Sequence, residues 1–181
     1  MMKKLALPCL LCLSLGLPSI AKASLFNFNE VGISYGHGID VENWTQVDFI
    51  QHISPSLGIL EEYFKEPFLD LGIATSQWKV SRDVAYHISS NLMLRSQDIS
   101  TGIGNIFLEA GFGPHLFSKP GGTGRLATAF EFNSFAGLGF RLNQHWAVVA
   151  RARHLSNAGI TDSNSGVNLY LLQLHYRFNQ P

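Results

Sequence analysis

The sequence predicts an all-β fold, an eight-stranded antiparallel transmembrane β-barrel of the outer-membrane type. Three observations predict it. Segments of about ten residues alternate between apolar and polar side chains, as membrane strands do. Arginines share one face of these segments while the opposite face is apolar, which suits a polar barrel interior. Beyond the first residues no apolar run approaches the roughly 20 residues that a membrane-spanning helix needs.

The N-terminal residues have the layout of a cleaved export signal. Lys3 and Lys4 precede an apolar run over residues 5–17, and Ala21 and Ala23 form a small-residue ending. We therefore expect a signal peptide over residues 1–23, with cleavage near Ala23, and a barrel domain over residues 24–181. Cys9 and Cys12 both lie in the leader, so the mature chain is expected to have no thiol and no disulfide.

The mature chain is expected to be slightly acidic. Without the leader it keeps ten basic residues against 13 acidic ones, which gives no sign of a nucleic-acid partner. The predicted location is the outer membrane of a Gram-negative bacterium. The sequence leaves open whether two barrels pair as a homodimer.

Strand positions follow from alternation with a period of two. The first half is clearest at residues 45–53, where Val47 and Phe49 alternate with Gln46 and Asp48. The segment 69–79 is weaker, and the connection over residues 54–68 is long for a turn at the inner end, so it is expected to be a short helix or a strand extension. The predicted strands of this half are 31–39, 45–53, 69–79 and 86–97.

The second half has sharper alternation. In the segment 145–156, Trp146, Val148, Ala150 and Ala152 share a face, and Arg151 and Arg153 lie on the other. The predicted strands are 106–117, 128–142, 145–156 and 167–178. Eight strands make a barrel too narrow for a pore, so the interior is expected to be filled by side chains.

The interior rows supply opposite charges. The predicted pairs join the basic residues Arg95, Arg141, Arg151, Arg153 and Arg177 to the acidic residues Asp48, Asp70, Glu109 and Glu131. Aromatic side chains near strand ends, Trp44, Tyr86, Trp146, Tyr170, Tyr176 and Phe178, are expected to form interfacial belts. Four dispersed histidines on the inward rows, His52, His87, His115 and His175, do not indicate a metal site, and no cofactor is expected.

One strand carries a candidate active site. His154 and Ser156 lie two residues apart on the outward face, near the end that precedes the loop 157–166. A serine hydroxyl becomes nucleophilic when a base removes its proton, and a neutral imidazole is the natural base. A third group must hold the other imidazole nitrogen. Asn168, on the outward face of the next strand, has an amide oxygen in the right place.

The run Arg153-His154-Leu155-Ser156-Asn157-Ala158-Gly159, followed by Asn164-Ser165-Gly166-Val167-Asn168, resembles the lipid A 3-O-deacylase (PagL) family of outer-membrane esterases. The resemblance implies hydrolysis of the ester-linked acyl chain at position 3 of lipid A in the outer leaflet. It implies His154 as base and Ser156 as nucleophile. The family's third catalytic residue is a glutamate, and Asn168 stands at that position here.

The side-chain amide of Asn168 cannot offer negative charge to the His154 imidazolium. We therefore expect either a slow enzyme or a different catalytic acid, for which Asp162 in the adjoining loop is the candidate. Asn157, through its side-chain amide, and Gly159, through its backbone, are the expected oxyanion donors. The competing hypothesis is a catalytically weak or inactive barrel with a structural or lipid-interaction role.

Overall fold

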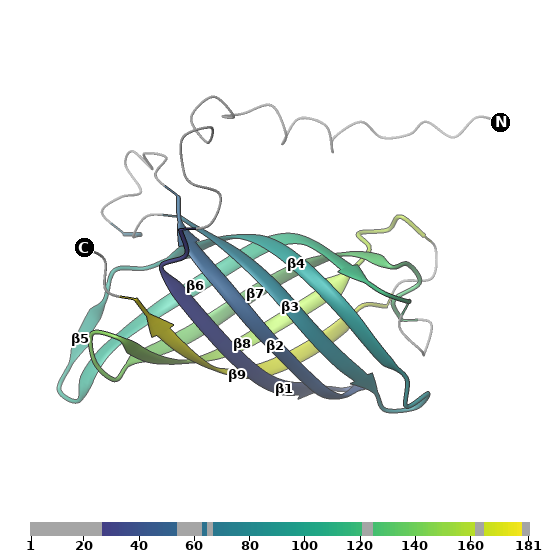
Figure 1. Ribbon diagram of the computed structural model, residues 1–181, viewed down its shortest axis with the longest axis horizontal. Coiled ribbons are helices and arrows are strands. Elements are labelled where there is room, and N and C mark those ends of the chain that lie inside the picture. The colour runs from purple at the N-terminus through teal and green to yellow at the C-terminus, as the bar shows by residue number, and fades with distance from the viewer. Residues whose placement is uncertain (1–26, 54–62, 65–66, 121–124, 162–164, 179–181) are drawn as a thin grey trace, which may run out of the picture.

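The chain forms a closed antiparallel barrel in a computed structural model that describes residues 27–53, 63–64, 67–120, 125–161 and 165–178 (Figure 1). Its strands are β1 (Glu30–Gly38), β2 (Val41–His52), β3 (Phe68–Trp78), β4 (Val84–Arg95), β5 (Ile99–Thr101), β6 (Gly104–Phe117), β7 (Phe130–Arg141), β8 (Trp146–Ser156) and β9 (Val167–Arg177). The predicted signal peptide and residues 179–181 lie outside the described residues. No described helix is both long and apolar enough to cross a membrane.

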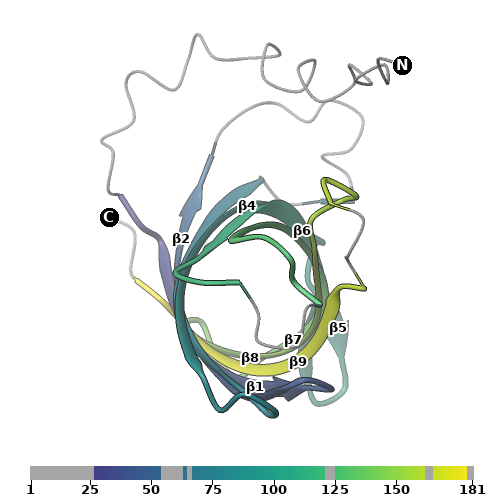
Figure 2. The same cartoon turned by 90° about the vertical axis from the view of Figure 1, so that its right-hand side faces the viewer.

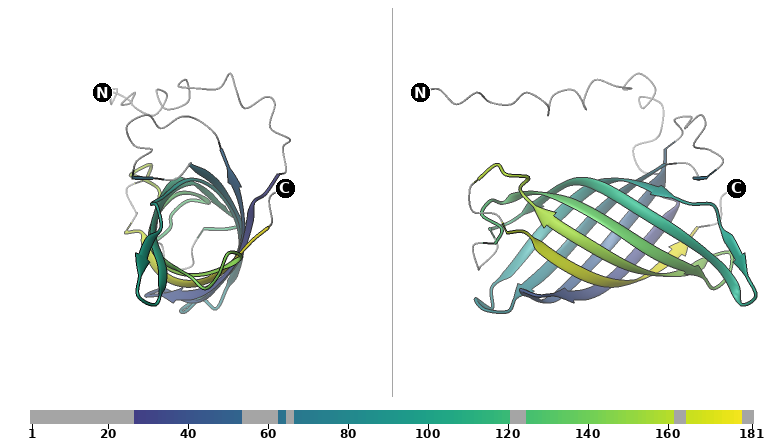
Figure 3. Two further views of the ribbon diagram at one scale, coloured as in Figure 1. Left: turned by 90° about the vertical axis from the view of Figure 1, so that its left-hand side faces the viewer. Right: turned by 180° about the vertical axis from the view of Figure 1, so that it is seen from behind.

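Eight strands close the ring. Apart from the short β5, each strand pairs antiparallel with the next one along the chain, so that β4 pairs with β6. The last strand, β9, pairs with β1 and closes the ring. The ring is plain in Figure 2 and in the left panel of Figure 3, which look into the barrel from opposite ends. The predicted number of strands in the barrel is therefore confirmed. The three-residue β5, which pairs with the start of β6, is a hairpin extension that the sequence did not indicate.

The strand alternation was predicted correctly. In β9 the inward residues are buried and the outward ones exposed without a break from Val167 to His175. Apolar side chains cover the outer wall: Ile33, Ile73, Ile88, Leu108, Leu138 and Leu172 each expose more than half of their surface. So large an exposed apolar surface marks contact with something other than water.

The interior is a network of ion pairs. Arg151 donates to Glu109 (Nη2 to Oε1, 2.5 Å) and to Asp70 (3.3 Å), and Arg95 donates to Glu109 and to Glu30 (2.8 Å). These five side chains expose 3% of their surface or less, so each charge depends on the others for compensation.

Several predicted partners differ. Arg177 pairs with Glu30, and Arg141 with Asp98, two acids that sequence reasoning left out. Arg153 contacts no acid directly in the described part of the chain; it donates to Gln46 Oε1 at 2.6 Å. Gln46 in turn hydrogen-bonds Asp48. Trp44 was wrongly predicted at the membrane interface: it is fully buried in the lumen, where its indole nitrogen donates to Gln46.

The connections between strands alternate between the two ends of the barrel. Residues 39–40, 79–83, 118–129 and 157–166 join strands at one end, which we call the site end; residues 53–67, 96–103 and 142–145 join them at the other. Outer-membrane barrels usually have short turns at one end and longer loops at the other. From β6 onward the connections follow this rule, with the long loops at the site end. It fails for the first strands, where the two-residue turn lies at the site end. Within the long connection, Phe64 forms an isolated bridge with Ser96.

Apolar side chains pack inside the barrel toward the site end. Leu126, in the connection between β6 and β7, is fully buried in a cluster with Val41, Trp44 and Leu155. Figure 2 shows described parts of this connection within the ring outline. Arg125 Nε pairs with Asp40 across the rim at 2.7 Å, and Lys119 pairs with Asp83 at 2.9 Å. The hydrogen bond from Lys119 keeps the pKa of Asp83 below its ordinary value.

Candidate active site

The candidate site lies on the outer wall at the end of β8. His154 is exposed on the outward face, and its register partner on β9 is Asn168. Facing cross-strand residues lie close enough for their side chains to meet. Here they do, since His154 Nδ1 lies 2.7 Å from Asn168 Oδ1. The sequence-predicted contact between these two residues is therefore present.

This contact determines which imidazole nitrogen is free. An amide oxygen only accepts hydrogen bonds, so Nδ1–H of a neutral imidazole is the donor and Nε2 carries no proton. A neutral ring with a free Nε2 is the form that can remove a proton from a serine hydroxyl. The amide thus orients the base without supplying charge.

Ser156 is half-buried at the end of β8, two residues beyond His154 on the same face. No hydrogen bond joins Ser156 Oγ to His154 within the described residues. Because catalytic hydrogen bonds in substrate-free enzymes are often long and tighten on binding, this arrangement is compatible with a catalytic pair. The geometry therefore brings together His154 and Asn168, two of the three predicted catalytic residues.

The turn after Ser156 is tightly organised by Asn157. This side chain is fully buried. Its Nδ2 donates to Thr161 Oγ1 at 2.7 Å, and its Oδ1 accepts the Gly159 N–H at 3.0 Å. Ala158 (φ 53°) and Gly159 (φ 80°) adopt the left-handed conformation that reverses the chain. The oxyanion role of Asn157 and Gly159 stays a prediction, and for Gly159 it requires that the N–H leave Asn157 Oδ1.

The alternative acid, Asp162, lies outside the described residues. Among the described residues the hollow around His154 is lined by no carboxylate, and the side chain of Arg153, which also borders it, is buried in the lumen. No group of three or more potential metal ligands occurs in the described part of the chain.

A hollow of about 510 Å³ adjoins the imidazole on the outer wall. Small side chains from β7 and β8 form its floor, and Tyr170 of β9 borders it. The outward side chains that line it are Ser134, Ala136, Ala152, His154, Asn168 and Tyr170. Pairing places Ser134, His154 and Asn168 in one row across three strands, and Ala136, Ala152 and Tyr170 in the next. The hollow therefore extends from the imidazole toward the middle of the wall.

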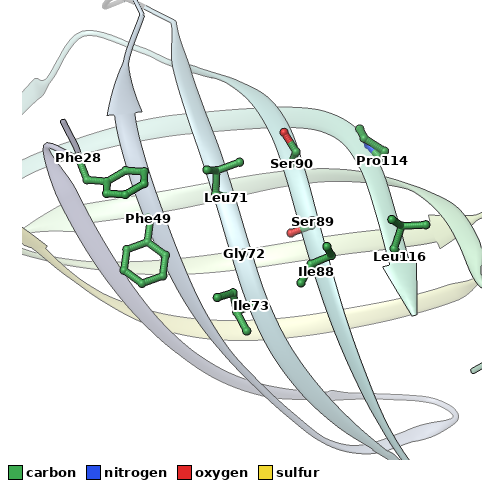
Figure 4. Close-up of a pocket in the computed structure, with 10 residues that line it drawn as sticks. All are labelled: Phe28, Phe49, Leu71, Gly72, Ile73, Ile88, Ser89, Ser90, Pro114 and Leu116. Atoms are coloured by element: carbon green, nitrogen blue, oxygen red, sulfur yellow. The ribbon is translucent and has the colours of Figure 1, made fainter. Parts of the chain in front are cut away.

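A second hollow of about 450 Å³ lies on the wall formed by β2, β3, β4 and β6. Figure 4 shows Phe49, Leu71, Ile73, Ile88 and Leu116 around it. It contains no residue of the histidine and serine site, and its accessible lining is nearly all apolar. Of these two hollows, the one beside His154 and Asn168 is therefore the one that adjoins the predicted catalytic residues.

Comparison with known proteins bears directly on this arrangement. The family model of lipid A 3-O-deacylase (PagL) matches residues 29–177, which include the whole barrel and every candidate site residue. The chain belongs to the PagL family. The resemblance noted in the sequence around His154 is confirmed.

This chain is also similar to a curated relative and to a solved structure. Lipid A deacylase PagL of Bordetella bronchiseptica is 37% identical over 73 residues, a match that covers 40% of this chain and 41% of the relative. The crystal structure of the outer membrane enzyme PagL superposes with a TM-score of 0.65 at 19% identity, covering 82% of this chain and 99% of the other. The barrel fold is thus shared with this structure.

Proposed function

We propose that this protein is an outer-membrane serine esterase that hydrolyses the 3-O-linked acyl chain of lipid A. The observation that carries the proposal is the 2.7 Å contact between His154 Nδ1 and Asn168 Oδ1 on the outer wall, two residues from Ser156 and beside an open hollow. Membership of the PagL family supplies the substrate class.

The outer wall supports a membrane location. Its exposed leucines, isoleucines and aromatic residues suit hydrocarbon, and the ion pairs are confined to the lumen. With the site end toward the outer leaflet, His154 and Ser156 lie near the depth at which the acyl chains of lipid A join the sugar. The hollow then has the position to receive the scissile acyl chain.

The chemistry needs only groups on this wall and water. Ser156 Oγ attacks the ester carbonyl while its proton passes to His154 Nε2, and the carbonyl oxygen becomes an oxyanion. The tetrahedral intermediate then collapses: the bond to the sugar oxygen breaks, and His154 returns the proton to that oxygen. Water, activated by the same imidazole, attacks the acyl-serine and releases a fatty acid.

Asn168 affects each of these proton transfers through the ring. Its oxygen holds the Nδ1–H tautomer, which keeps Nε2 available, but the neutral amide gives the imidazolium little electrostatic stabilisation. We therefore propose that turnover is slow compared with that of a carboxylate-bearing site. If Asp162 approaches the ring, it supplies the missing charge.

A second candidate function, a catalytically weak or inactive barrel with a structural or lipid-interaction role, is favoured by the same amide and by the unformed Ser156–His154 hydrogen bond. Mass spectrometry of lipid A incubated with the purified protein in detergent separates the two. Loss of one 3-O-linked acyl chain with the wild type, but not with Ser156→Ala, is expected of the esterase. Unchanged lipid A over long incubation with a folded wild-type barrel supports the inactive alternative.

A further inference from the structure

Gly166, the residue before β9, lies against the edge of the His154 imidazole. It is buried and has a φ of 67°. A Cβ atom added there would lie 2.7 Å from His154 Cε1, 3.0 Å from Nε2 and 2.9 Å from the backbone oxygen of Leu155. The first and last of these separations are shorter than real Cβ contacts, so position 166 has room for hydrogen alone.

Two contacts therefore define the orientation of the ring. Asn168 Oδ1 meets it at Nδ1, and the bare Cα of Gly166 packs beside the adjoining edge, formed by Cε1 and Nε2. Since Asn168 is uncharged, it provides only one neutral hydrogen bond, which would permit the imidazole to tilt. Gly166 supplies the steric restraint that this single bond lacks.

We propose that Gly166 is a positioning residue for the general base: its missing side chain lets the loop pack on the imidazole and fixes the ring with Nδ1 on Asn168 and Nε2 free for Ser156. The proposal rests on the proposed function for its catalytic consequence, and on geometry for the position of the ring. Gly166 itself touches no reacting atom of the substrate.

The physical consequence of a methyl group at position 166 can be worked out. Leu155 O belongs to the β7–β8–β9 ladder and cannot move without breaking strand pairing, whereas the imidazole is the free end of a side chain. The contact with Leu155 O is therefore relieved by a small shift of residue 166 itself, and the closer contact with the ring by rotation of the imidazole, which takes Nδ1 away from Asn168. The left-handed backbone alone does not prevent folding, because Ala158 in the preceding turn already has a φ of 53°.

The test is Gly166→Ala, with Gly104→Ala as a matched control. Gly104 also has a positive φ (148°), and a Cβ there would lie 2.6 Å from an aromatic ring atom, Phe140 Cζ, but it lies at the other end of the barrel. Folding of each variant is checked by the heat-dependent shift of the barrel on SDS gels. Turnover of lipid A is measured by mass spectrometry, and the His154 ring nitrogens by ¹⁵N NMR in micelles, with His154→Gln used to identify their signals.

For Gly166→Ala we expect kcat to fall about 100-fold, the loss typical of a reacting group misplaced by about 1 Å, with KM nearly unchanged. The distinct Nδ1–H and Nε2 signals of His154 should move toward values for a ring in rapid tautomer exchange. Gly104→Ala should keep both kcat and the His154 spectrum of the wild type.

Wild-type kcat in Gly166→Ala, or a lower kcat with an unaltered His154 spectrum, would overturn the proposal. If the wild type itself leaves lipid A intact, the esterase function fails independently, and the NMR comparison alone decides whether Gly166 positions the ring.

Discussion

Charge at position 168 is the most informative perturbation of the site. Asn168→Asp is nearly isosteric with the native side chain, so its carboxylate oxygen can occupy the place of Oδ1, 2.7 Å from His154 Nδ1. Asn168→Glu restores the residue type implied by the family at this position but adds a methylene group. Both variants supply the negative charge that the amide lacks.

The expected gain follows from the hydrogen bond itself. A neutral hydrogen bond contributes about 0.5–1.5 kcal/mol and one to a charged group about 1.5–3 kcal/mol. The difference, about 1–2 kcal/mol, corresponds to a rate increase of roughly 5- to 30-fold. This is far below the roughly 10⁴-fold effect of the Asp→Asn change in serine proteases, because that change also imposes the wrong tautomer, whereas the amide here already accepts from Nδ1.

The assay is kcat/KM for release of the 3-O-acyl chain from lipid A in mixed micelles, followed by mass spectrometry. Asn168→Leu, which removes the acceptor, should lower the rate. Ser165→Asp places a charge on an exposed residue of the same loop and controls for a general effect of charge on lipid binding. If Asn168→Asp is folded and no faster than the wild type, the missing charge does not limit the rate and the reasoning is refuted.

Two further variants test the barrel and the hollow. Arg151→Met leaves Glu109 and Asp70 without their shared cation and should lower the free energy of unfolding, measured in urea, by about 3–5 kcal/mol. The double variant Arg151→Met/Glu109→Gln should recover part of this loss. Equal stability of Arg151→Met and the wild type would contradict the ion-pair account. Ala152→Phe fills the hollow beside His154 and should raise KM for lipid A while the His154–Asn168 contact persists. An unchanged KM would show that the acyl chain binds elsewhere.

Much of the barrel could be predicted because alternation directly encodes which face of a strand is apolar. The rows of β8 and β9 follow the two-residue period from Trp146 to Leu155 and from Val167 to His175. Trp44 was predicted at the membrane interface because the predicted strand began at Thr45. Since Trp44 and Gln46 are two residues apart, they lie on the same face of the strand, which is the face toward the lumen. The strand in fact extends to Val41, with an irregular register beside Asn43.

Ion-pair partners were harder to predict than which side chains of a strand point into the lumen. Glu30 and Asp98 lie at or beyond the ends of the predicted strands, and their contacts with Arg95, Arg177 and Arg141 depend on how the closed ring brings distant strand ends together. The short strand β5 has too few residues for an alternation signal.

In the site, the pairing of His154 with Asn168 followed from a shared face and a shared end of two adjacent strands. The conformation of Ser156 does not follow from the strand period, because it depends on a side-chain torsion. The role of Gly166 is likewise invisible in the alternation. Its signal is a glycine directly before a strand, which indicates a special backbone conformation but not the imidazole that it contacts.

Covalent trapping of the nucleophile tests the central claim most directly. A long-chain alkyl fluorophosphonate, which reacts with activated serines, is added to the folded barrel in micelles, and the labelled peptide is found by mass spectrometry. We expect one adduct on Ser156, lost in His154→Ala and retained in Ser165→Ala. A folded wild-type barrel that stays unlabelled, or one labelled at another serine, would contradict the assignment of His154 and Ser156 as the base and nucleophile of an esterase.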